Sequence, residues 1–503
     1  MKKRIPLSIL VFFSGILFTV LFYKQTPGLN LLLFEAIIIS VILFIQHDRP
    51  QSRIAIFTCC ATLASAIAFV INYTNFAFVV NLVSFYLFIG VLIFQEAKSV
   101  STSFGLAASN LRLSVQKFFA GLGSVPAGQQ GTSIRTYAWR FRIIFFLVPV
   151  ILLFLVMYAM SNPYFNDALA DGLQPVIDLF RHMEYDLPLV FSLGISCSVF
   201  ALVRVAVPEA VQYDMQSSIQ LQRKRRNVWI RNSFGLKKEV IAAKFLFIVL
   251  NILLLLVNIL DIRHVWFNFQ WNGTYLKQFV HEGTYLLIVS IFISIGIVLY
   301  FFRGNVNFYR KSKALKHLAV LWMIQNAILA VSVAIRNFHY ISYFALAYKR
   351  IGVIFFLILT LYGIWTVVLK IRNQYSVFYL FRNNLMAMFI MILFISFFNW
   401  ENMIVRYNFN HAKTAFLHYD FLAEMPDKAL PLLDRSKEEL QLADVYQQHL
   451  FRFNVRYMSA EEFLEKIKNQ KELFRKKWEA KSLLSWNYAE YAAYQKLFMT
   501  AGK

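Results

Sequence analysis

Apolar runs of about 16–21 residues recur along the chain and limit its fold more than any other feature. Each run is long enough to cross the roughly 30 Å hydrocarbon core of a bilayer as a helix. Solid runs such as FLFIVLNILLLLVNIL lack the alternation of a membrane β-strand. The sequence therefore predicts an all-α, polytopic transmembrane helical bundle of about eleven spans. The spans are 5–23, 31–46, 54–71, 76–95, 143–160, 187–207, 245–262, 284–302, 318–335, 351–371 and 385–400.

The basic residues predict which way this bundle lies in the membrane. The net charge is +24, but it is divided among short loops between spans, which is typical of the positive-inside rule and not of nucleic-acid binding. With the N-terminus inside, most loop lysines and arginines are cytoplasmic, and about eleven spans place the C-terminus outside. The basic cluster Arg223–Arg226 can contact anionic lipid, or it can serve topology alone.

Composition changes after the last span. Residues from Glu401 onward carry acidic and basic side chains in similar numbers, and their apolar positions follow helical spacing. We therefore expect three parts: a transmembrane region of about six spans at 1–240, a transmembrane core of about five spans at 241–400, and an extracytoplasmic α-helical domain at 401–503. That last domain is a candidate surface for an envelope protein partner.

Familiar motifs of catalysis and of metal or cofactor binding do not occur. The sequence has no P-loop, GxGxxG, HExxH or GxSxG motif, and its histidines lack ligand spacing. Cys59, Cys60 and Cys197 lie in apolar runs and form no zinc or disulfide pattern. We therefore expect no metal, no cofactor and no enzymatic activity.

Charged and aromatic residues gather in the segment SVAIRNFHYISYFALAYKRI at 332–351. Arg336, Tyr340, Tyr343 and Arg350 recur at offsets that place them on one helical face. The predicted topology brings them to the outer surface together with Asp261, Glu282 and Arg406. These groups either neutralise one another, because an unpaired charge at that depth is costly, or bind an anionic or lipid-linked ligand.

Polar residues also lie inside the predicted spans. Asn251 and Asn258 are seven residues apart and share a stripe, with Gln325 and Asn326 as natural partners. They predict either interhelical hydrogen bonds or a polar pathway. Glu35, in the run LLLFEAIII, either relays protons or ions or is a neutral group bonded within the bundle.

Four segments carry a resemblance to a known family: VLNILLLLVNILDIRHVWF, YLKQFVHEGTYLLI, the 332–351 segment and NWENMIVRYNFNHA. Together they resemble the bacterial multi-pass family called domain of unknown function 4173, with its sister family 4153. The sequence departs from that pattern at Phe344, Ala345 and Ala347, where tyrosine, glycine and threonine are expected, and at Thr284, where an aromatic residue is expected. The residues that match it are Asn251, Asp261, Glu282, Gly283, Arg336, Tyr340, Arg350, Arg406 and Asn408.

The resemblance implies a bacterial inner-membrane protein and names no reaction. We keep three hypotheses for its function. The first is a non-enzymatic scaffold or sensor that presents the outer helical domain. The second is a transporter or channel for an ion or small anionic solute. The third is an enzyme or binder acting on lipid-linked glycan at the outer face, with the arginines holding phosphate.

Overall fold

The computed structural model describes residues 6–45, 52–122, 186–223, 235–267, 269, 273–450 and 458–499, without the side chains of 121–122, 273–285 and 448–450. The predicted span 143–160 and most of the basic cluster lie outside these ranges. Within them the chain is all-α, apart from one isolated β-bridge between Gln220 and Tyr375.

The fold is that of a helical membrane protein. Within the described residues, six segments are long and apolar enough to cross a bilayer. Four shorter apolar helices accompany them, at Leu7–Phe22, Leu29–Ile45, Asp186–Leu202 and Leu286–Phe301. The six longer segments are Arg53–Asn72, Asn75–Ile93, Leu236–Phe267, Arg310–Phe344, Tyr348–Asn373 and Val377–Ser396.

Ten of the predicted spans fall in the described ranges, and each overlaps one of these helices. The total of eleven, the orientation and the three-part division stay predictions. Several predicted boundaries differ from those of the helices, for example 245–262 against Leu236–Phe267 and 318–335 against Arg310–Phe344. The last span does not begin at 385, because α15 (Val377–Ser396) starts where the Ser376 hydroxyl accepts from the Tyr379 amide, and Trp400 already belongs to α16.

The chain forms two compact units, of which the first comprises residues 1–50 and 106–207. In it, α1 (Leu7–Phe22) packs along α8 (Asp186–Leu202), and α2 (Leu29–Ile45) contacts both. Small residues allow the close approach, because a Cβ on Gly194 would lie 2.8 Å from the Phe18 Cβ and 3.0 Å from the Gly15 carbonyl oxygen.

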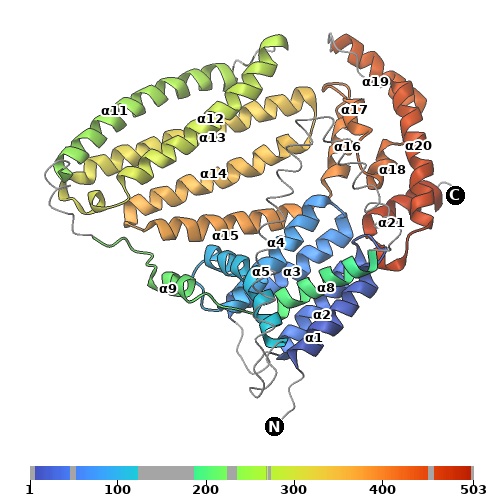
Figure 1. The fold of residues 1–503 in the computed structure, drawn as a ribbon. Helices are drawn as coiled ribbons and strands as arrows, with labels where there is room; N and C mark the ends of the chain where they lie inside the picture. Colours follow the sequence, from blue (N-terminus) through green and yellow to red (C-terminus); the bar gives the residue numbers. More distant parts are fainter. Residues whose placement is uncertain are drawn as a thin grey trace, which may run out of the picture. The chain divides into compact units, whose positions relative to one another are not determined.

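The second unit comprises residues 51–105 and 208–503. It starts with α3 (Arg53–Asn72) and α4 (Asn75–Ile93), and continues through α5 (Val100–Leu122), whose residues from 106 on belong to the first unit. Further along, α13 contacts α11, α12 and α14, and α14 contacts α15 (Figure 1). The helices of this unit that come between α5 and α15 are α9 (Pro208–Gln216), α11 (Leu236–Asp261) with a π-helical turn (Ile262–Phe267), α12 (Gly273–Phe301), α13 (Lys313–Phe344) and α14 (Tyr348–Asn373).

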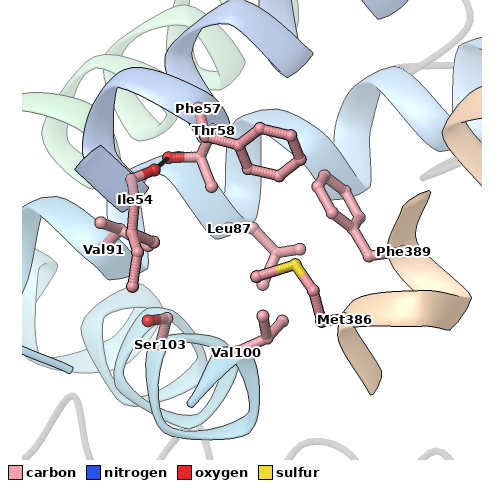
Figure 2. A pocket seen from close by; sticks show the side chains of 9 residues that line it. All are labelled: Ile54, Phe57, Thr58, Leu87, Val91, Val100, Ser103, Met386 and Phe389. Carbon is pink, nitrogen blue, oxygen red and sulfur yellow. Dashed lines mark hydrogen bonds between the residues drawn. The ribbon is translucent and has the colours of Figure 1, made fainter. Parts of the chain in front are cut away.

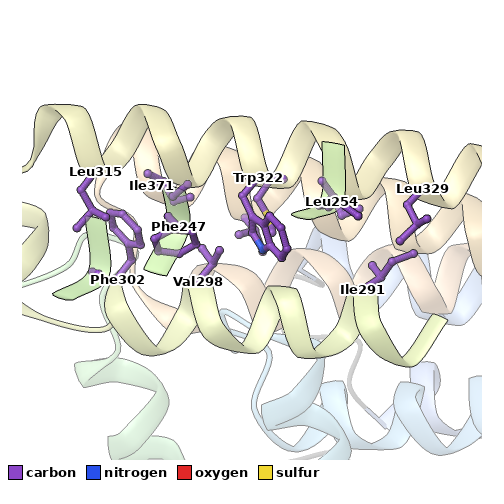
Figure 3. Close-up of a cluster of buried hydrophobic side chains, with 14 of the residues drawn as sticks. Phe247, Leu254, Ile291, Val298, Phe302, Leu315, Trp322, Leu329 and Ile371 are labelled. Carbon is purple, nitrogen blue, oxygen red and sulfur yellow. The ribbon is translucent and has the colours of Figure 1, made fainter. Parts of the chain in front are cut away.

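An apolar core fills the space between α11, α12, α13 and α14. Figure 3 shows Phe247, Val298, Phe302, Leu315 and Trp322 pointing toward one another from these helices. All of them are buried, so this cluster holds the long helices together.

The tail of the chain builds a second core. Its helices are α16 (Trp400–Asn410), α17 (Tyr419–Leu422), α18 (Leu430–Leu433), α19 (Lys437–Leu450), α20 (Ala460–Glu479) and α21 (Tyr488–Tyr494). Leu422, Leu430, Phe463 and Phe474 are buried in it, together with Ile351 of α14. A capping box at Ser459 and Glu462 fixes the start of α20. We call residues 400–499 the tail domain.

The first prediction compares two phenylalanines of α11. Phe247 is fully buried in the core, whereas Phe245 is 72% exposed. We expect Phe247→Ala to lower stability by about 3 kcal/mol, because it leaves a cavity among four helices. Thermal unfolding in detergent measures this, with Phe245→Ala as the matched control. Equal midpoints for the two variants would contradict the assignment of this core.

Candidate functional site

A seam of amide side chains joins α11 to α13. The Gln325 amide donates to the Asn251 side-chain oxygen at 2.7 Å. Asn251 itself donates to the Leu318 carbonyl at 3.1 Å, and Asn258 donates to the Gln325 carbonyl at 3.1 Å. The structure therefore brings together three of the four predicted polar residues as interhelical hydrogen bonds.

Asn326, the fourth, is placed differently. Its side chain is buried, and its amide donates at 2.8 Å to the Trp322 carbonyl of its own helix. The one-residue step from Gln325 turns it by about 100° around the helix, away from the seam that Gln325 serves.

A buried ion pair lies at the end of this seam. The Arg336 guanidinium donates to Asp261 at 2.5 Å, and both side chains are almost fully buried. Nearby, the Trp266 indole donates to the Ser332 hydroxyl at 2.9 Å, and a His339 ring nitrogen lies 3.1 Å from the Val265 carbonyl oxygen. The pair neutralises two charges that would each be costly alone in an apolar surrounding.

Arg350 serves a different purpose from Arg336. It donates to the Phe344 carbonyl at 2.5 Å and also to the Ala345 carbonyl, and its guanidinium lies 4.5 Å from the Tyr340 ring centroid. A cation at these carbonyls complements the negative end of α13. Arg350 and Tyr340 thus close the turn between α13 and α14.

Two predicted residues remain, and the structure describes the side chain of only one of them, Arg406. Arg406 is exposed on α16. The side chain of Glu282 lies outside the described part of the structure. The predicted group therefore divides into an Asp261–Arg336 pair, an Arg350–Tyr340 contact and a separate Arg406.

The α13–α14 turn is also held by the tail domain. The Leu346 amide donates to the Asn408 side-chain oxygen at 2.8 Å, and the Asn408 amide donates back to the Leu346 carbonyl at 3.1 Å. In addition, the Phe416 amide donates to the Tyr343 carbonyl at 2.7 Å. Asn408, a residue of the resemblance, is thus a structural link between bundle and tail.

Sequence reasoning missed a second link, made by Lys428. Its ammonium lies 2.8 Å from Glu401 and donates to the Asn72 and Tyr73 carbonyls at 2.7 and 3.3 Å. Lys428 is 3% exposed, and burial lowers its pKa although the Glu401 charge acts in the opposite direction. We call this set of contacts the Lys428 clamp. The signal in the sequence was a single lysine in the apolar stretch MPDKALPLL.

A third link lies beside it. The Lys481 ammonium pairs with Glu490 and lies 4.7 Å from the Tyr73 ring centroid. Tyr73 has a left-handed backbone conformation, with φ of 48°, which ends α3. This conformation turns the Tyr73 carbonyl toward Lys428 of the tail domain.

Two cavities in the described part of the second unit differ greatly in size. The space between α3, α4, α5 and α15 measures about 10 Å³ and is lined mainly by apolar side chains such as Phe57, Leu87 and Phe389 (Figure 2). That is about the volume of one water probe. A cleft of about 570 Å³ opens elsewhere in the second unit, bordered by 216–222, 303–306 and 376–378.

Among the buried charges, Glu35 and Lys370 lie apart from these links. Glu35 is 3% exposed on α2 of the first unit. Lys370, near the end of the predicted span 351–371, is 1% exposed and donates to the Phe302 carbonyl at 2.8 Å. In the part of the chain that the structure describes, no group of three or more histidine, cysteine or acidic side chains is arranged to hold a metal ion.

The geometry defines a helical membrane protein whose polar side chains join its helices and its tail domain. A model of one family, the domain of unknown function DUF4153, matches residues 33–436. The chain therefore belongs to the DUF4153 family. The resemblance had pointed first to 4173 and to 4153 as its sister, so the family number is corrected to the sister. No curated protein and no solved structure matches the chain.

The second prediction concerns the Asp261–Arg336 pair. We expect Arg336→Ala to destabilise the protein by about 3–5 kcal/mol, because Asp261 would remain buried without its partner. Membrane levels and thermal unfolding measure this loss of stability. The variant should be impaired in folding or insertion more than in any transport-like activity. Arg406→Ala, at an exposed site, is the matched control and should change stability by less than about 0.5 kcal/mol. Normal membrane levels of Arg336→Ala, together with a lost phenotype, would refute a structural role for the pair.

The third prediction concerns Ala345, which has φ of 60° and ψ of −165°. That region is populated almost only by glycine, the residue that the family pattern expects there. We expect Ala345→Gly to raise stability by about 1–3 kcal/mol by relieving strain. Ala347→Gly is the control, because Ala347 has an ordinary extended backbone and gains nothing. A lower unfolding midpoint for Ala345→Gly would show that the turn is not strained.

Proposed function

We propose that the protein is a non-enzymatic scaffold or sensor of the bacterial envelope that presents its tail domain outside the cytoplasmic membrane. The observation that carries this proposal is the attachment of the tail domain. It is bonded to the α3–α4 turn through Lys428 and to the α13–α14 turn through Asn408. Such bonds hold a folded domain in a fixed position, which suits a protein that displays a surface or reports a change in its bundle.

The polar seam supports the same role. Asn251, Gln325 and Asn258 donate to partners on the neighbouring helix, and Asp261 is paired with Arg336. Groups used in this way stabilise helix packing. They are the contacts expected of a structural core more than of an open polar pathway.

The tail domain offers an apolar surface for a protein partner. Leu442 and Val445 lie three residues apart on α19 and are both about half exposed. Three-residue spacing puts them on one face of that helix. Exposed apolar pairs of this kind can serve as anchors for a partner helix.

The outside location is supported by the predicted sidedness. The lysines and arginines of the loops favour an inside N-terminus. The two turns that the tail domain contacts, at Tyr73–Thr74 and at Ala345–Ala347, are both outer loops in that topology. A reporter fused after Lys503 that is active only in the cytosol would exclude this location.

The fourth prediction tests the partner. A photo-crosslinking residue placed at Val445 of the full-length protein in cells should give one discrete adduct with an envelope protein. The same residue at exposed Lys468 of α20 is the matched control. The Val445 adduct should be lost in Leu442→Asp, because a charge disrupts an apolar contact. Equal adduct patterns at Val445 and Lys468 would exclude a partner at this surface.

Glu35 favours a second candidate, a transporter or channel. A carboxyl group buried in an apolar helix is typical of a proton or ion relay. Substrate flux in proteoliposomes that Glu35→Gln abolishes would decide for it.

The lipid-linked glycan hypothesis is less favoured, because Arg336 and Arg350 are engaged by Asp261 and by backbone carbonyls. Activity that survives removal of these two arginines and Arg406 would dismiss it.

A further inference from the structure

The α3–α4 turn marks the edge of the membrane for the second unit. α3 has 20 residues and α4 has 19, and only Tyr73 and Thr74 separate them. At about 1.5 Å per residue, a 20-residue helix is roughly 30 Å long, which equals the thickness of the hydrocarbon core. Two residues cannot project far from the ends of such helices. The turn therefore lies at the boundary between hydrocarbon and headgroups.

The last helices of the tail domain lie at this same level. The Lys481 ammonium is 4.7 Å from the Tyr73 ring centroid, and α21 packs against α3. Leu483 follows Lys481 by two residues and begins a short 3-10 helix that ends at Ser485. The backbone between Lys481 and Leu483 can span no more than about 7 Å. Leu483 is thus held close to the membrane boundary.

The side chains of this segment are those of an interfacial anchor. Leu483 is 75% exposed, the highest fraction among the exposed large apolar residues of the tail domain whose side chains are described, and Tyr488 is also exposed. Trp486 and Tyr491 lie 5.9 Å apart between ring centroids. Tryptophan and tyrosine favour the headgroup layer.

We propose that the segment Lys481–Tyr491 lies in the interfacial layer of the bilayer and that Leu483 inserts among the lipid chains. The tail domain then has two attachments at the α3–α4 turn. The Lys428 clamp fixes it to the protein, and the Leu483 segment fixes it to lipid. This contact is independent of whether the protein is a scaffold, a sensor or a transporter, because it depends only on the membrane position of the α3–α4 turn.

The fifth prediction tests this contact with a spin label. The full-length protein carries Leu483→Cys in a background with Cys59, Cys60 and Cys197 changed to serine. It is reconstituted in nanodiscs of phosphatidylethanolamine and phosphatidylglycerol. Relaxation by oxygen, which concentrates in lipid, is compared with relaxation by a water-soluble nickel chelate. Leu473→Cys is the matched control, because Leu473 is 66% exposed on α20 of the same domain.

The expected ratio of oxygen to nickel relaxation is several-fold higher at 483 than at 473. A ratio at 483 equal to that at 473 would overturn the proposal, because the residue would then face water. A label at 483 shielded from both reagents would also overturn it, since a protein partner or a second copy would cover the residue. Leu483→Asp supplies a second measurement, the hydrogen exchange of the α21 amides. This exchange should rise in nanodiscs, but not when the protein is kept in solution by an amphipathic polymer without lipid. Equal α21 exchange in Leu483→Asp and the parent protein in nanodiscs would count against lipid contact.

Discussion

The ammonium group of Lys428 is the contact on which the arrangement of the second unit depends. It joins Glu401 at the start of α16 to two backbone carbonyls at the end of α3, and it is almost completely buried. Removing one partner of such a buried pair leaves an uncompensated charge, so the contact forms fully or the interface opens. The carbonyls at Asn72 and Tyr73 need a donor because α3 ends there in a left-handed turn. The lysine and the turn thus satisfy each other.

The other polar links repeat this pattern of a side chain that completes a backbone end. Arg350 donates to the last carbonyls of α13, and Lys370 donates to the Phe302 carbonyl. The Asn408 side chain bonds both the backbone amide and the backbone carbonyl of Leu346. In an apolar surrounding an unbonded carbonyl is costly, so these residues set where each helix can stop. The same kind of contact therefore fixes both the helix ends of the bundle and the position of the tail domain.

Much of this could be predicted from the sequence, because helical spacing and topology constrain long helices strongly. Asn251 and Asn258 share a stripe, and that stripe meets Gln325 as expected. For the charges predicted at the outer face, two interpretations had been open, mutual neutralisation or ligand binding. Asp261 and Arg336 make a contact of the first kind. Asn326 fails the expectation because neighbouring residues on a helix point in different directions. The family pattern had a glycine where Ala345 stands, and the backbone angles there explain that glycine.

What could not be predicted depends on contacts between distant segments. Lys428 bonds a carbonyl 356 residues away, and no periodic pattern links the two. A lysine near the end of a span usually reaches water, yet the Lys370 ammonium donates a hydrogen bond to the Phe302 carbonyl between α12 and α13. The most direct test of the account is hydrogen exchange of Lys428→Met in the full-length protein, with Lys477→Met as the control because its pair with Asp427 is exposed. The account predicts that amides of Leu430–Leu433 and α21 exchange roughly a hundredfold faster in Lys428→Met, equivalent to about 3 kcal/mol, and hardly change in Lys477→Met. Unchanged exchange in Lys428→Met would contradict it.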